Sequence, residues 1–409
     1  MKHYTRQTLL IALLACGMIA GANWLANPYL MFNAPVIPGI NQWITENYYK
    51  QLLFKPYQLR LQKPQSLILG ASQAGVAFNP DLLPQPAYNL AVGGSTSYLQ
   101  YRLLQEALAA SPAINHVILE TPFLSFNNDD PNNTPGADAA LEHRLSLQRD
   151  GNRNFLRPGY AAEEILSSLL SWDITRASIR MISKQEAISN KSRGSFIQLR
   201  NGQWIQQASP DSHTRQLMKN SWKKTLFNDW LPAPAHSYSL GNGQHGPLDF
   251  YRQNLRQLYQ RNIDTRIVIA PMHASLMIGL QQARLWPTYQ QWKKSLLAIN
   301  SEEAASAGKP AFPLFDYAVI NEQTTENFPA AESTTPMQGF NDSIHVSPQR
   351  GDLILREILS GTPQTGRLLD SDNIDKSLAG DDIALTRYIE THPDMQAEMQ
   401  QLFRNHETP

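Results

Sequence analysis

The stretch LILGASQAG, residues 67–75, runs from three apolar side chains through a glycine to a serine. A short apolar run that ends at a glycine is typical of a buried β-strand followed by a turn. Ser72 stands two residues after Gly70, where that strand runs out. Two interpretations are open for Ser72: a nucleophile at the edge of a sheet, or the N-cap of the helix that follows the strand.

Further apolar runs of this kind alternate with segments of helical periodicity. The expected strands cover residues 65–72, 87–94, 116–123, 265–274 and 312–317. The expected helices cover residues 99–110, 283–300 and 348–359. Continuous apolar strands that alternate with helices are typical of a parallel sheet covered on both faces. The sequence therefore predicts an α/β fold.

The predicted domain, residues 28–360, is interrupted and is followed by a polar tail. A stretch at about 127–247 is rich in Asn, Ser, Arg and Gln and contains helix-like pieces. We interpret it as a largely helical insertion that lies beside the carboxyl ends of the strands and shapes the site, because long loops of this kind carry function. Residues 361–409 form the polar C-terminal tail, in which 380–404 is expected to be a surface helix without a functional role.

The N-terminal segment has the features of a membrane anchor. Lys2 and Arg6 precede an uncharged run over residues 8–26, long enough to nearly span a hydrocarbon core of about 30 Å. The basic flank predicts a cytoplasmic tip at 1–7, a transmembrane anchor at 8–27 and the remainder outside the cytoplasm. The expected topology is single-pass, with the body of the protein exported. A cleaved signal peptide is the alternative, since Ala20–Ala22 offers small residues for cleavage.

Composition excludes several classes of function. Lys and Arg together number 35, as do Asp and Glu, so the net charge of zero argues against nucleic acid as a partner. The only cysteine, Cys16, lies in the apolar N-terminal run, which leaves the rest of the chain without disulfides or cysteine zinc sites. The histidines show no metal-ligand spacing. We therefore expect neither a metal nor a cofactor.

Ligands bind at the carboxyl ends of the strands in open parallel sheets. The residues expected there include Ser72, Gly94, Thr121 and His273. The last predicted helix follows the loop GFNDSIHVSP, which brings Asp342 and His345. A serine hydroxyl needs a base to become a nucleophile, and imidazole oriented by a carboxylate is the usual base.

The order of these segments resembles that of the SGNH, or GDSL-like, hydrolase superfamily over about 60–126 and 262–360. Ser72 in LGASQA takes the place of the first-block serine, and YNLAVGGST resembles the second block, with Asn89 and the oxyanion glycine Gly94. The segment NDSIH matches the last block with Asp342 and His345. The third-block asparagine that completes the oxyanion hole has no counterpart in VILETPFLSFNND; Thr121 or a backbone amide is the candidate substitute.

The resemblance implies a flavodoxin-like three-layer sandwich with a parallel sheet. It implies catalysis by Ser72, Asp342 and His345 and oxyanion binding by the amides of Ser72 and Gly94; Asn89 and His273 are candidate substrate-binding residues. The layout is similar to that of membrane-anchored SGNH-like proteins that O-acetylate bacterial cell-surface polysaccharides. We expect an exported acyl esterase or O-acetyltransferase that acts on a cell-surface glycan, with a glycan or an acyl donor and polysaccharide-modification membrane proteins as partners. The resemblance implies a location in the bacterial inner membrane, single-pass, with the catalytic domain in the periplasm or otherwise outside the cytoplasm. The alternative is a catalytically silent scaffold in a polysaccharide modification or export complex.

Overall fold

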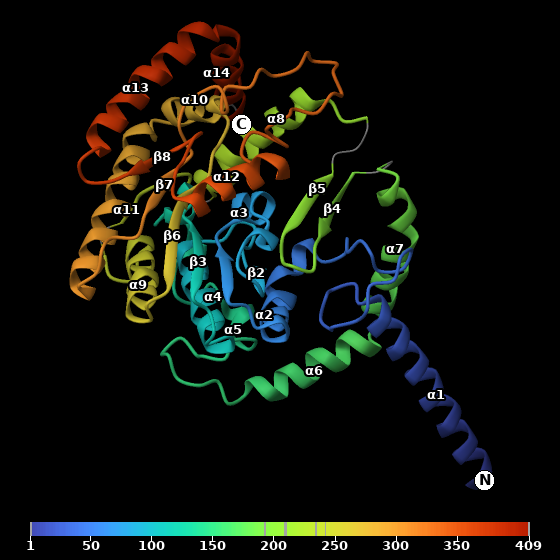
Figure 1. Cartoon of the computed structure of the whole chain (residues 1–409). Coiled ribbons are helices and arrows are strands. Elements are labelled where there is room, and N and C mark those ends of the chain that lie inside the picture. Colours follow the sequence, from blue (N-terminus) through green and yellow to red (C-terminus); the bar gives the residue numbers. More distant parts are fainter. Residues whose placement is uncertain (1, 192–193, 208–210, 234, 242, 408–409) are drawn as a thin grey trace.

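The computed structural model describes residues 2–191, 194–207, 211–233, 235–241 and 243–407. Met1 of the predicted tip, the last two residues of the tail and several positions of the predicted insertion lie outside these ranges. The chain forms a globular α/β part from which one N-terminal helix projects (Figure 1).

A six-stranded sheet forms the centre of the globular part, in the order β2-β1-β3-β6-β7-β8. All neighbouring strands run parallel except β8, which pairs antiparallel with β7 at one edge. The strands are β1 (Ser66–Leu69), β2 (Ala87–Asn89), β3 (His116–Glu120), β6 (Asp264–Ile269), β7 (Leu314–Asp316) and β8 (Arg367–Leu369). The chain reverses its direction of winding between β1 and β3, and such a switch point is where parallel sheets bind ligands.

Alternate residues of each strand face opposite layers, as the two-residue period of a strand requires. In β1, Leu67 and Leu69 join a large apolar core under one set of helices, while Ile68 joins a second core on the other face. The first face is covered by α2 (Gln51–Gln62), α4 (Ser97–Ala110), α9 (Pro247–Gln260) and α11 (Trp286–Ala307). The second face is covered by α3 (Ser72–Ala77) and α12 (Pro348–Ser360). The predicted α/β fold with a mostly parallel sheet is confirmed.

The predicted insertion contains helices and one antiparallel hairpin that the sequence analysis did not anticipate. The hairpin pairs β4 (Ser195–Gln198) with β5 (Trp204–Gln207). The helices are α5 (Ala139–Glu142), α6 (Arg157–Leu170), α7 (Trp172–Ser189) and α8 (Thr214–Lys224), and α8 continues into a π-helical turn at Thr225–Trp230. Short 3-10 turns occur at Tyr48–Lys50, Pro80–Leu82, Phe123–Phe126 and Pro131–Asn133, and α10 (Ala274–Gln282) follows β6.

The C-terminal tail is part of the fold, which corrects the expectation of a separate polar tail with one surface helix. It supplies strand β8 and two helices, α13 (Ile374–Thr391) and α14 (Pro393–Glu407), which pack over α10. Tyr388 in α13, with Met395, Met399 and Phe403 in α14, belongs to the large core.

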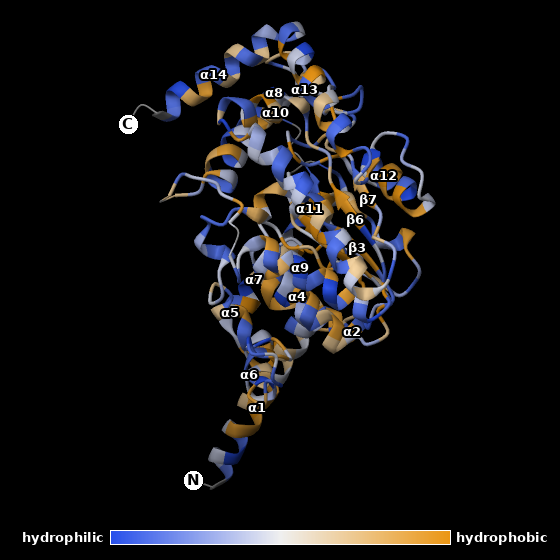
Figure 2. Ribbon diagram, turned by 90° about the vertical axis from the view of Figure 1, so that its left-hand side faces the viewer, coloured by the Kyte–Doolittle hydropathy of each residue, from blue (hydrophilic) through white to orange (hydrophobic). Residues whose placement is uncertain are grey.

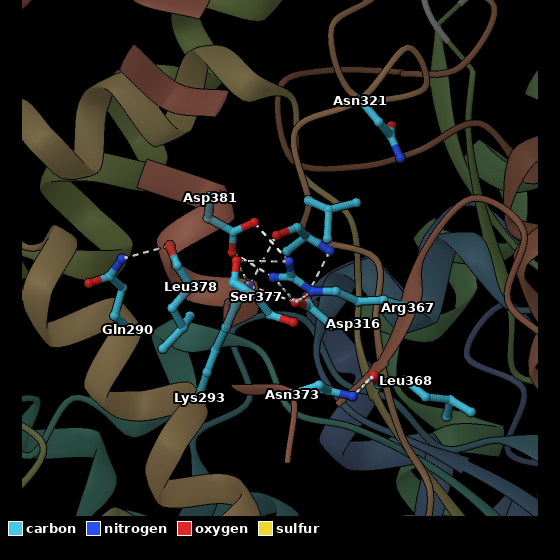
Figure 3. Close-up of polar contacts among 12 residues, drawn as sticks. Gln290, Lys293, Asp316, Asn321, Arg367, Leu368, Asn373, Ser377, Leu378 and Asp381 are labelled. Atoms are coloured by element: carbon cyan, nitrogen blue, oxygen red, sulfur yellow. Dashed lines mark hydrogen bonds and ion pairs between the residues drawn. The ribbon is translucent and has the colours of Figure 1, made fainter. Parts of the chain in front are cut away.

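A buried charge cluster fixes this tail to the sheet (Figure 3). Asp316, at the end of β7, accepts hydrogen bonds from Lys293 Nζ at 2.8 Å and from Arg367 Nη2 at 2.7 Å. Arg367 Nη1 also donates to Asp381 Oδ1 in α13 at 2.9 Å. Asp316 therefore serves to join α11, β8 and α13, although a strand-end carboxylate is a natural candidate for a binding site.

Helix α1 (Lys2–Ala26) projects from the globular part, and its middle section is hydrophobic (Figure 2). Among the described residues, its His3–Ala26 segment is the one helix long and apolar enough to cross a membrane. At a rise of 1.5 Å per residue a helix of this length spans about 36 Å. Most of its large apolar side chains, such as Leu9, Leu13 and Met18, are exposed, so no protein core accounts for them.

Candidate active site

A cavity of about 220 Å³ lies where α3, the loop before α12 and the insertion meet. Its wall contains Ser72, Asp342 and His345, which are far apart in the sequence. The remaining lining residues come mainly from the hairpin and from α8: Tyr48, Val76, Phe196, Trp204, Gln206, Leu217, Asn220, Ser221, Lys224, Thr225 and Ile344. The predicted insertion thus contributes to the wall around Ser72, as expected from its length and position.

Ser72 is the first residue of α3, one position beyond the N-cap. The N-cap is Ala71, whose extended backbone (φ −105°, ψ −154°) turns the chain from β1 into the helix. The interpretation of Ser72 as an N-cap is therefore wrong. The amides of a first helical turn lack acceptors within the helix, so the Ser72 N–H belongs to a group that is able to bind a developing oxyanion.

A buried carboxylic acid occupies the space beside Gly70 and leaves no room for a larger residue there. A Cβ at Gly70 would overlap the side chain of Glu120, which ends β3. Glu120 Oε2 accepts a hydrogen bond from the Ala71 N–H at 2.6 Å, and Oε1 is buried without a partner. Glu120 thereby fixes the turn that presents Ser72.

The buried position of Glu120 makes its carboxyl group a weaker acid than usual. Burial raises its pKa to about 7, against the opposing effects of the Ala71 and Ala74 amides and of nearby His345. A group that titrates near neutrality beside a candidate base is a feature of functional sites.

Asp342 and His345 form a hydrogen-bonded pair in the loop before α12. Nδ1 of His345 lies 2.8 Å from Asp342 Oδ2, and Asp342 Oδ1 accepts from the backbone amides of Ile344 and His345 at 2.9 Å each. Burial alone would raise the pKa of Asp342, but the His345 ring and these amides outweigh it and lower that pKa. An ionised Asp342 only accepts, so Nδ1 is the donor in this hydrogen bond, and in the neutral ring Nε2 is the atom that carries the lone pair.

Nε2 of His345 is buried and has no hydrogen-bond partner. Ser72 Oγ therefore does not bond to it in this structure, although both residues line the same cavity. Catalytic hydrogen bonds are often long or unformed before substrate binds. The arrangement has an oriented base whose accepting atom is free.

Contacts from three elements hold the loop that carries this pair. Gln73 Nε2 donates to the carbonyl of Ile344 at 3.2 Å, which ties the loop to the residue after Ser72. The His273 amide donates to the Ser343 carbonyl at 2.9 Å, and Ser343 Oγ donates to Ser221 Oγ at 2.7 Å. The loop that carries the imidazole is thus held by α3, by the N-cap of α10 and by α8 of the insertion.

The wall has an aromatic part and a polar part. The rings of Tyr48 and Phe196 stack with centroids 4.2 Å apart, and the buried indole of Trp204 lies beside them on the lining. Gln206, Asn220 and Lys224 supply polar groups to the same lining. Aromatic faces together with a few placed polar groups suit a ligand that has both apolar and hydroxyl-bearing faces, such as an acylated sugar.

A buried lysine supports the aromatic part from behind. Lys55 Nζ donates to the carbonyls of Asn89, Ala91 and Gly202 at 2.9, 2.6 and 3.1 Å. It also lies 5.1 Å from the Trp204 ring centroid. Burial lowers the pKa of Lys55. These three bonds join the end of β2 to the hairpin and so position Trp204.

The structure does not bring the two other predicted oxyanion residues into the cavity wall. Gly94 is exposed in the turn after β2, with a left-handed backbone (φ +68°), and is not a lining residue. Both the amide and the hydroxyl of Thr121 donate to the Val268 carbonyl, at 2.9 and 3.3 Å. Thr121 is therefore occupied by a contact between strands.

The two predicted substrate-binding residues are buried and take part in internal contacts. Asn89 Nδ2 donates to the carbonyls of Ala74 and Phe78, so it holds the end of α3. The His273 ring caps α10 through the Ser275 amide and contacts the Glu326 carbonyl at 2.7 Å. Burial lowers the pKa of His273 to about 4, which keeps this ring neutral at physiological pH.

Glu120, Lys55 and Trp204 are the site residues that the sequence analysis missed. Each is separated by many positions from the residues it supports, and Trp204 belongs to a hairpin with a polar sequence. One feature of the sequence was related to Trp204. Gly75, the second glycine of the stretch 67–75, makes room for the aromatic wall, because a Cβ there would overlap the Trp204 ring.

A comparison with models of known protein families and with curated protein sequences finds no match. Function therefore has to be argued from the site itself. Within the described ranges, no three His, Cys, Asp or Glu side chains are placed to hold a metal ion.

Proposed function

We propose that the chain is a serine-dependent acyl esterase or O-acetyltransferase that acts through an acyl-serine intermediate. One observation carries the proposal: His345, which pairs with Asp342 through Nδ1 and has an unpartnered Nε2, lines the same cavity as Ser72. The strand order supports a flavodoxin-like, SGNH-hydrolase-like sandwich, since the parallel strands taken in chain order lie 2-1-3-4-5.

In this mechanism, Ser72 Oγ comes within hydrogen-bond distance of His345 Nε2 when substrate binds. Oγ attacks the acyl carbonyl while Nε2 takes its proton, and Asp342 stabilises the imidazolium that forms. His345 then returns the proton to the departing alkoxide, which leaves the acyl group on Ser72. Water or a sugar hydroxyl next gives its proton to His345 and attacks the acyl-serine, which releases an acid or an acylated sugar.

The amide of Ser72 is the oxyanion donor on which this mechanism depends. Gly94 lies outside the wall and Thr121 is occupied, so the second donor of the family pattern is not in position. Loss of one oxyanion donor typically lowers the rate by about 10²–10³. The enzyme is therefore expected to be slow on simple esters and to gain from a good acceptor.

The size and wall of the cavity favour a small acyl group on a carbohydrate. Its volume of about 220 Å³ lies below the range of about 300–1,000 Å³ that is usual for drug-sized ligands. An acetyl ester fits such a space, and the stacked rings of Tyr48 and Phe196 offer a face for a sugar.

We further propose that α1 anchors the protein in the bacterial inner membrane with the domain in the periplasm. Lys2 and Arg6 on one side of the apolar run support this orientation, because basic flanks stay in the cytoplasm. Alkaline phosphatase fused to the C-terminus should then be active in cells, and inactivity of a stable fusion would contradict the orientation.

Variants of the full chain in detergent test the activity. Hydrolysis of a nitrophenyl acetate and acetyl transfer to an oligosaccharide should both be lost in Ser72→Ala, and to a similar extent in His345→Ala, because such residues act as a unit. Asp342→Asn should also lose activity, since the ring would be left in the wrong tautomer. Ser360→Ala, at an exposed position at the end of α12, is the matched control.

The positions of Gly94 and Thr121 favour one alternative, a catalytically silent scaffold in a polysaccharide modification or export complex. Activity that is unchanged in Ser72→Ala would rule out the nucleophile. A folded parent chain without activity toward any acceptor, together with normal complex formation by Ser72→Ala, would favour the scaffold.

A further inference from the structure

Helix α6 turns its polar face toward the protein and its apolar face outward. Glu164 accepts from Arg144 Nη2 at 2.6 Å and from the Tyr57 hydroxyl at 2.7 Å, and Ser168 is buried on the same side. Leu166 is 58 % exposed and Leu170 is 46 % exposed on the opposite side, together with the exposed Glu163. A surface helix of a globular protein normally shows the reverse arrangement.

The exposed apolar surface continues past both ends of the helix. Phe155 and Leu156 precede α6, and Trp172, 70 % exposed, begins α7. We call this surface the outer face of α6; it comprises Phe155, Leu156, Ile165, Leu166, Leu170 and Trp172. Contiguous exposed apolar residues of this kind mark an interaction surface rather than ordinary scatter.

Hydrogen bonds fix the outer face next to the end of α1. Asn23, near the end of α1, is buried and donates to the Leu169 carbonyl at 2.9 Å and to Thr175 Oγ1 at 3.0 Å. Ser178 Oγ donates in turn to Asn23 Oδ1 at 3.1 Å. Figure 1 shows α6 running across the side of the globular part from which α1 extends. A bilayer crossed by α1 would begin at the level of these contacts.

We propose that the outer face of α6 lies in the membrane interface, inserted between lipid headgroups beside the point where α1 enters the bilayer. The inference rests on the proposed membrane anchoring by α1. Interfacial helices place an apolar face about 5–10 Å into the boundary between headgroups and acyl chains, and Trp is favoured at that depth. Two attachments, α1 and α6, hold the domain in one orientation close to the membrane.

Lipid is the occupant that the geometry selects. The outer face is continuous with α1 through the Asn23 contacts, so any bilayer around α1 reaches it without further assembly. A second copy of the chain or another membrane protein would have to displace that lipid, and both are outcomes of the test.

The test uses the full chain in phosphatidylcholine vesicles and a fluorophore that emits at shorter wavelength in apolar surroundings. It is attached at Leu166→Cys in a Cys16→Ser background, and lipids with a nitroxide near the headgroup act as quenchers. A label at Ile383→Cys, an equally exposed apolar position on α13, is the control. The native Cys16, exposed on α1, reports separately on the anchor when labelled in the unaltered chain, with nitroxides deep in the acyl chains.

The expected result is strong quenching at residue 166 by the shallow nitroxide, little quenching at 383, and quenching of Cys16 by the deep nitroxide. A quenched Cys16 with an unquenched, solvent-exposed residue 166 would overturn this inference and leave the anchor intact. A blue-shifted but unquenched label at 166 would show that protein covers the face and would also overturn it. An unquenched Cys16 would refute the anchor, and this inference with it.

Discussion

Replacement of Glu120 by Gln should change how the stability of the protein depends on pH. The carboxyl group of Glu120 is fully buried at the end of β3, one oxygen accepts the Ala71 amide, and the other has no partner. Burial raises its pKa from 4.5 to about 7. Between these values the folded protein keeps the proton that the unfolded chain releases. The folded state then binds more protons, so the free energy of unfolding falls as pH rises through this window and levels off above about 7.

The size of the effect follows from the same interval. From 4.5 to about 7, at about 1.4 kcal/mol per pH unit, the loss of stability is at most about 3.5 kcal/mol. Gln has nearly the same shape, its amide oxygen still accepts the Ala71 amide, and it does not ionise. The free energy of unfolding of Glu120→Gln, relative to that of the parent, should therefore rise by up to that amount between pH 5 and pH 8. All other titrating groups are the same in the two proteins, so their effects cancel in this difference.

Urea unfolding of the full chain in detergent, followed by the fluorescence of its eight tryptophans, measures this difference at several pH values. Glu390→Gln, at an exposed position on α13, is the matched control and should follow the parent at every pH. Parallel curves for the parent and Glu120→Gln between pH 5 and pH 8 would refute the assignment of a buried, nearly neutral acid at this position.

Two further substitutions test the contacts that position the site and the tail. Arg367→Ala should lower the free energy of unfolding by about 3–5 kcal/mol, because Lys293 would then be the one cation paired with the Asp316 and Asp381 carboxylates among the described residues. Lys294→Ala, which breaks an exposed pair with Asp375, should cost less than about 1 kcal/mol in the same urea titration. Gly75→Ala should lower the free energy of unfolding by about 1–3 kcal/mol and reduce esterase turnover, because its Cβ would displace the Trp204 ring. The control Gly380→Ala, with open space around it in α13, should leave the free energy of unfolding unchanged or raise it by up to about 1 kcal/mol. An equal loss of stability in both variants would show that the Trp204 contact is not the cause.

The parallel sheet was predictable because each of its strands is a nearly continuous apolar run. Residues such as Leu67, Ile68 and Leu69 pack against helices on both faces, and this double burial leaves a strong pattern in the sequence. Strand β8 and the β4–β5 hairpin left no such pattern. Strand β8 has three residues, and its first residue, Arg367, fixes it through ion pairs with Asp316 and Asp381. Both partners are distant in the sequence, so local composition indicated only a polar tail.

The candidate site was predictable where chemistry imposes a residue type at a strand end or in a short loop. Asp342 and His345 lie three positions apart, and one turn of the chain is enough to pair them. Gly94, Thr121, Asn89 and His273 also follow or lie in strands, yet the structure uses the buried side chains for internal hydrogen bonds and leaves Gly94 in an exposed turn. Position along a strand does not reveal whether a polar group faces the cavity or a neighbouring backbone carbonyl.

Labelling with a fluorophosphonate tests whether His345 activates Ser72 as a nucleophile. Such a probe phosphonylates an activated serine with loss of fluoride, and peptide mass spectrometry of the full chain locates the adduct. We expect an adduct on Ser72 in the parent, none in Ser72→Ala, and strongly slowed labelling in His345→Ala. A folded parent chain that acquires no adduct at Ser72, or that is labelled there equally fast after His345→Ala, would contradict this activation.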